Sequence, residues 1–73
     1  MGLDRTIPDL LQAERQIAES ERRIIVHRAN IAERQRHGQG VELRLFMLAT
    51  MEESLRFMRG DREQILDERK RTD

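Results

Sequence analysis

Two stretches of the chain carry hydrophobic residues at alternating spacings of three and four, the period of an α-helix that buries one face against a neighbour. The first stretch predicts a helix over about residues 7–37. Pro8 falls in its first turn, where a missing N–H costs nothing, and Gly38 is a natural stop. Its buried face, the seam, is expected to consist of Leu10, Ala13, Ile17, Ser20, Ile24, His27, Ile31 and Arg34. A second row, Leu11, Ala18, Ile25 and Ala32, is expected beside it.

The second stretch predicts a helix over about residues 41–69. Gly60 lies off its seam, and we expect the helix to continue through it because Ile65 and Leu66 resume the pattern in phase. Residues 38–40 hold two glycines and are predicted to form a short turn between the helices. The seam of the second helix is expected to consist of Val41, Arg44, Leu48, Met51, Leu55, Met58, Arg62 and Ile65.

A turn this short forces two helices to run antiparallel. If the chain folds back about Gln39, Ile24 lies opposite Leu55 and Ile31 lies opposite Leu48. Both seams fit this one register, which is independent support for a hairpin. The predicted fold is therefore all-α, a coiled-coil-like antiparallel two-helix hairpin that forms a single domain over residues 1–73.

Composition agrees with this fold and removes several other classes of protein. The 73 residues suffice for one small domain, and 38% of them are charged, as in long amphipathic helices. The absence of cysteine excludes a disulfide framework and a Cys-type zinc site. No apolar run approaches the ~18 residues of a membrane span. Charged residues within Leu3 to Gln12 lead us to expect no signal peptide.

Several large apolar residues do not fit into a single interface between two helices. A monomeric hairpin would leave them in water, and such patches usually mark protein interfaces. The economical solution is a two-fold dimer that forms a four-helix bundle, with an intersubunit surface of Ile25, Leu45, Phe46, Met47 and Phe57. Two alternatives stay open at this point: the flanking residues wrap a loose monomeric hairpin, or they dock a different protein.

Residues that carry chemistry are few. His27 occupies a seam position, where one interpretation is a metal ligand or a pH switch. The other is a polar residue that sets the register by bonding to Glu52 or to its dimer mate. No Glu-x-x-His or His-x-x-x-His spacing accompanies it, and Ser20 and Ser54 have no base nearby in sequence. We therefore expect no catalytic residue, no metal site, no cofactor and no enzymatic activity.

Charge is balanced over the chain, with 14 basic and 14 acidic residues, but it is unevenly distributed. Between residues 22 and 44, six arginines stand against Glu33 and Glu42, so the turn end is basic and the far end acidic. One interpretation is a nucleic-acid footprint, by analogy with the plasmid copy-number regulator Rop, a short helical hairpin that dimerises and binds RNA. The other is head-to-tail complementarity that orients an antiparallel dimer. The six arginines are Arg22, Arg23, Arg28, Arg34, Arg36 and Arg44.

Three short segments resemble a set of small alphaproteobacterial proteins that share an ERRI segment, an IA-x-R segment, a glycine-containing turn and a closing R-x-x-IL. The matching segments are residues 17–24 (IAESERRI), 31–34 (IAER) and 55–66 (LRFMRGDREQIL). The resemblance implies a helical hairpin in a bacterial cytoplasm, without an assigned activity. Family members often carry an Asp or Thr cap before the second helix, where this chain has Gly40.

The sequence as a whole therefore predicts a non-enzymatic interaction or regulatory protein that acts as a homodimer in the cytoplasm. Its expected partners are a second copy of itself and another protein, with no membrane partner. The alternative function is an Rop-like dimer that binds RNA or another nucleic acid through the arginine-rich turn end.

Overall fold

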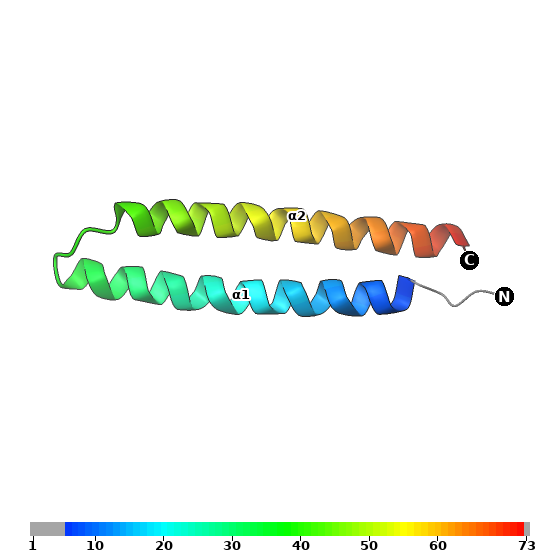
Figure 1. Ribbon diagram of the computed structural model, residues 1–73, viewed down its shortest axis with the longest axis horizontal. Coiled ribbons are helices and arrows are strands. Elements are labelled where there is room, and N and C mark those ends of the chain that lie inside the picture. Colours follow the sequence, from blue (N-terminus) through cyan, green and yellow to red (C-terminus); the bar gives the residue numbers. More distant parts are fainter. Residues whose placement is uncertain (1–5, 73) are drawn as a thin grey trace.

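The computed structural model describes residues 6–72, which form two helices joined by a short turn. Helix α1 spans Thr6–Arg36 and helix α2 spans Glu42–Thr72. They lie side by side and run antiparallel, so that the described ends of the chain meet at one end of a narrow hairpin (Figure 1). The predicted all-helical hairpin is confirmed for the described residues; residues 1–5 and 73 of the predicted domain lie outside them.

The helix ends differ from the predicted ends by one to three residues. Helix α1 begins and ends one residue earlier than expected, and α2 begins one residue later. Helix α2 continues without interruption past Gly60 and reaches Thr72, beyond the predicted end at residue 69. Its last turn carries Arg69, Lys70 and Arg71, whose positive charges suit the negative end of the helix dipole.

Gly38 ends α1 through a Schellman arrangement. Its φ is +69°, and its N–H donates to the Gln35 carbonyl at 3.1 Å. The next N–H, that of Gln39, reaches back to the Arg34 carbonyl at 2.9 Å. Two carbonyls of the last helical turn are thereby satisfied, and the left-handed residue redirects the chain into the turn before α2.

Gly38 and Gly60 give a matched pair of substitutions with opposite expected effects. Gly38→Ala should destabilise the hairpin by about 1–2 kcal/mol, because a Cβ is strained at that positive φ. Gly60→Ala should stabilise it by up to ~1 kcal/mol, because a Cβ at this helical position meets no atom within 4 Å. Thermal melts of the two variants measure both effects. Shifts in the same direction would contradict this account of the turn.

The core lies along the seam between the helices. Ile17, Ile24, Ile31 and Leu55 are its buried members, and Leu48, Met51 and Met58 pack against them half-buried. Every residue expected in the seam of either helix is buried or half-buried, so the seam itself is confirmed. Of the second row predicted beside it on α1, only Ala18 is half-buried, and Leu11, Ile25 and Ala32 are exposed. Ile24 and Leu55, which were expected to face each other, belong to the same core cluster.

Ion pairs between the helices agree with the predicted register. Arg28 pairs with Glu52 at 2.6 Å, and Arg59 pairs with Glu21 at 3.0 Å. In each pair, the two residues lie within one position of the residues that become neighbours when the chain folds back about Gln39. Exposed ion pairs contribute little to the free energy of folding. We therefore expect these pairs to align the two helices, whereas the stability of the hairpin comes from its core.

Candidate interaction surface

The hairpin has two broad faces, one on each side of the seam, and their chemistry differs. The first, which we call the ion-paired face, is crossed by the two pairs just described and by a third from Arg62 to Glu14 at 3.3 Å. The opposite face, which we call the groove face, has two shallow depressions of about 680 Å³ and 460 Å³. Both depressions are lined by Glu19, Arg23 and Met51, so they follow one another along the hairpin.

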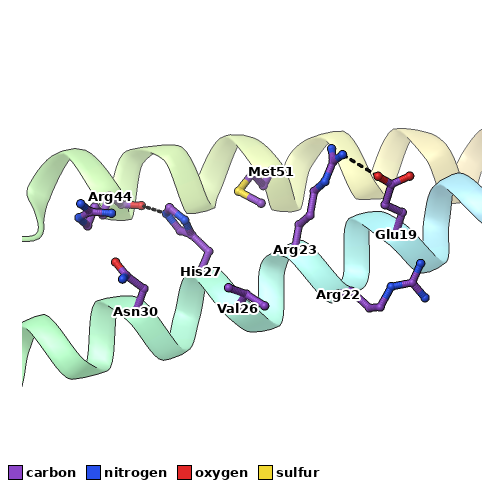
Figure 2. A pocket seen from close by; sticks show the side chains of 8 residues that line it. All are labelled: Glu19, Arg22, Arg23, Val26, His27, Asn30, Arg44 and Met51. Carbon is purple, nitrogen blue, oxygen red and sulfur yellow. Dashed lines mark hydrogen bonds and ion pairs between the residues drawn. The ribbon is translucent and has the colours of Figure 1, made fainter.

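The larger depression lies towards the turn end of the groove face (Figure 2). Val26 and Met51 supply apolar surface there, and Arg23 turns towards Glu19, with which it forms an ion pair of 2.6 Å. The groove is open to solvent, unlike the concave clefts that enclose most of a small molecule. Its lining consists of Glu19, Arg22, Arg23, Val26, His27, Asn30, Arg44 and Met51.

His27 lies in the groove on the turn side of Val26 and Met51 (Figure 2). Its ring points across to α2, where Nε2 donates a hydrogen bond to the Arg44 carbonyl oxygen at 2.9 Å (Figure 2). Because a carbonyl oxygen only accepts, the hydrogen bond requires a proton on Nε2. The expected bond from His27 to Glu52 is wrong, because Glu52 lies on the ion-paired face and accepts from Arg28 there. His27 thus links the two helices through backbone rather than through a carboxylate.

A stripe of large apolar side chains runs along α2 beside the groove. Leu43, Phe46, Met47 and Phe57 recur at spacings that return to one side of a helix, and Thr50 and Ser54 fill the positions between them. These six residues, which we call the α2 stripe, are all exposed, and Phe46 and Phe57 are each 70% exposed. Thr50 and Ser54 line the smaller depression, so the stripe borders the groove face.

The predicted dimer surface is divided between the two sides of the hairpin. Phe46, Met47 and Phe57 share the α2 stripe. Leu45 is 45% exposed but lies two residues from Leu43 and from Met47, a spacing that turns a helical side chain to a different side. Ile25, 64% exposed, lines a depression of the ion-paired face together with Glu21 and Arg28. The structure therefore gathers three of the five predicted residues and separates the other two from them.

The six arginines of the predicted nucleic-acid patch also lie in different places. Arg22, Arg23 and Arg44 line the groove, whereas Arg28 lies on the ion-paired face against Glu52. At the turn, Arg36 pairs with Glu33 at 3.4 Å, and His37 contacts the same carboxylate at 3.0 Å. Arg34 is half-buried beside the turn, and its Nε is buried without a hydrogen-bond partner.

Neither a metal-ligand cluster nor a membrane-spanning helix is found among the described residues. They contain no group of three or more His, Asp or Glu side chains placed to hold a metal ion. Neither described helix is long and apolar enough to cross a membrane. Ser20 and Ser54 both line the smaller depression, whose lining includes no histidine to act as a base.

Comparison with protein-family models, with curated proteins and with solved structures finds no match to this chain. The resemblance to small alphaproteobacterial hairpins therefore stays a prediction from the three segments that carry it.

Proposed function

We propose that this chain is a non-enzymatic interaction or regulatory module that acts as a homodimer, in which two hairpins combine into a four-helix bundle. The observation that carries the proposal is the distribution of large apolar residues. Among residues 6–72, four are buried in the hairpin core, whereas nine are exposed. Four of the nine, Leu43, Phe46, Met47 and Phe57, share the α2 stripe, and a contiguous apolar patch on a monomer usually marks a contact site.

The α2 stripe supports one surface over the others for this contact. Its spacing follows the same period as the seam, so α2 has a second apolar side fit for packing against another helix. One neighbouring helix in the hairpin already covers the first side. A two-fold dimer covers the second apolar side of α2 without a different partner, because each copy supplies the same surface to the other.

Nucleic-acid binding is less well supported by the arginines. Arg23, Arg28 and Arg36 each hold a carboxylate of the same chain, and a phosphate would have to displace it. The arginines also lie on different sides of the hairpin, whereas a phosphate-binding footprint gathers cations on one face. A protein contact is therefore the function that we favour, within the bacterial cytoplasm that the resemblance implies.

Sedimentation equilibrium of the pure chain tests the proposal. We expect a single species of twice the 8.7 kDa chain mass at micromolar concentration. A mass of one chain over the whole accessible range would contradict the homodimer. A mixed RNA pool, titrated at ~50 and ~200 mM salt, should bind negligibly at both; tight binding that weakens steeply with salt would favour the nucleic-acid function instead.

A further inference from the structure

We propose that the two hairpins pack groove face to groove face with their turns at opposite ends, about a two-fold axis that passes beside Thr50. This inference rests on the proposed homodimer and specifies its geometry. The occupant of the groove face is a second copy of the same chain. Three observations support it: the order of residue sizes along the α2 stripe, the charges at its two ends, and the ion pairs on the opposite face.

The α2 stripe is complementary to its own reverse. When two copies of α2 cross antiparallel about Thr50, residues equally far from Thr50 meet. Leu43 of one copy then meets Phe57 of the other, and Phe46 meets Ser54. These two pairs match a large side chain with an apolar or a small one, which allows close packing. The third large residue, Met47, falls level with Glu53, so that carboxylate has to stay at the solvent edge of the contact.

Thr50 suits the position on the axis, where a residue meets its own copy. Its hydroxyl already donates to the Phe46 carbonyl of the same helix at 3.1 Å. The methyl group is thus left as its available contact surface. A small residue whose polar group is satisfied can be covered by its symmetry mate at little cost, whereas a charged residue there would face its own charge.

Charge sets the relative direction of the hairpins. Arg36 and His37 lie at the turn, and Arg34 beside them has a buried Nε without a partner. When the second hairpin runs in the opposite direction, its Asp61 lies near this turn. Asp61 follows Phe57 along α2. Asp61 forms no ion pair within the described part of its own chain, so it would share Arg36 with Glu33, which is the carboxylate that Arg36 and His37 contact at the turn. Turns at the same end would instead bring two basic clusters together.

The ion-paired face is a poor alternative surface. Burying it would desolvate the three interhelical pairs that involve Arg28, Arg59 and Arg62. Removing charges from water costs more than their mutual attraction returns unless every remaining polar atom is satisfied. The groove face has no such interhelical pair among the described residues, and it has the apolar stripe at its border.

Cysteine cross-linking tests the geometry cleanly because the chain contains no cysteine of its own. Thr50→Cys should oxidise to a disulfide-linked species of twice the 8.7 kDa chain mass, since a residue on the axis lies against its own copy. Ala49→Cys is the matched control: the position is equally exposed but turned about 100° away, and it should stay unlinked. A mixture of Leu43→Cys and Phe57→Cys should link only as the mixed pair.

The outcomes separate this inference from the proposed homodimer. If the variants sediment as dimers but Thr50→Cys links no faster than Ala49→Cys, the geometry is overturned and the homodimer stands. If they and the unmodified chain sediment as single chains, both are overturned.

A charge exchange gives a second measurement of the direction. Arg36→Asp and Asp61→Arg should each raise the dimer dissociation constant about threefold, and the double variant should restore it. An additive loss in the double variant would overturn the opposed turns.

Discussion

Ile24→Ala and Leu55→Ala should each lower the free energy of unfolding by about 2–5 kcal/mol. The two side chains are 4% and 7% exposed and belong to the same core cluster, so truncating either leaves a cavity that the straight helices cannot fill. A domain of this size has a net stability of only a few kcal/mol, so either substitution removes most of that stability. Urea titrations followed by circular dichroism would measure the loss.

Arg15→Ala is the matched control for these variants. Arg15 is exposed on the same helix as Ile24, so its truncation should change stability by less than about 0.5 kcal/mol. If the Ile24 and Arg15 variants melted alike, the seam would be wrongly placed. Ile25→Ala serves as a second control, because Ile25 follows Ile24 in sequence and is 64% exposed.

The fold could be predicted from the sequence because every buried apolar residue of the described hairpin lies in the seam. Alternating spacings of three and four place Ile17, Ile24 and Ile31 on one side of α1, and only a neighbouring helix can cover that side. The end of α1 could also be predicted from the local sequence, because Gly38 takes the left-handed conformation that a helix end needs. Helix ends beyond such signals depend on solvent-exposed hydrogen bonds, so the end of α2 was underestimated by three residues.

The candidate site was harder to predict because it depends on which side of the seam each flanking residue occupies. The spacing of Leu43, Met47, Thr50 and Phe57 already indicates a second stripe, and the same period separates Leu45 from it. The partner of His27 had no sequence signal at all. It is a backbone carbonyl, that of Arg44, and only the placement of Glu52 on the other face made that carbonyl the available acceptor.

Replacing both phenylalanines of the α2 stripe by glutamate should convert the dimer into single chains. In Phe46→Glu/Phe57→Glu, two charges enter a surface that the proposed bundle dehydrates, and an unpaired charge is costly to bury. Helicity should also fall, because helices that lose their tertiary partner are only marginally stable. Sedimentation equilibrium reports the mass, and circular dichroism reports the helicity.

The double variant Ile25→Glu/Leu45→Glu is the control that makes this result specific. It adds the same two charges at exposed apolar positions, but away from the α2 stripe, so it should remain a dimer of near-normal helicity. If only this variant dissociated, the dimer contact would lie on the ion-paired face instead.

A Phe46→Glu/Phe57→Glu protein that sediments as a fully helical single chain would show that the hairpin folds without a second copy. The dimer would then be an association of stable hairpins, and the apolar stripe would serve contact rather than folding.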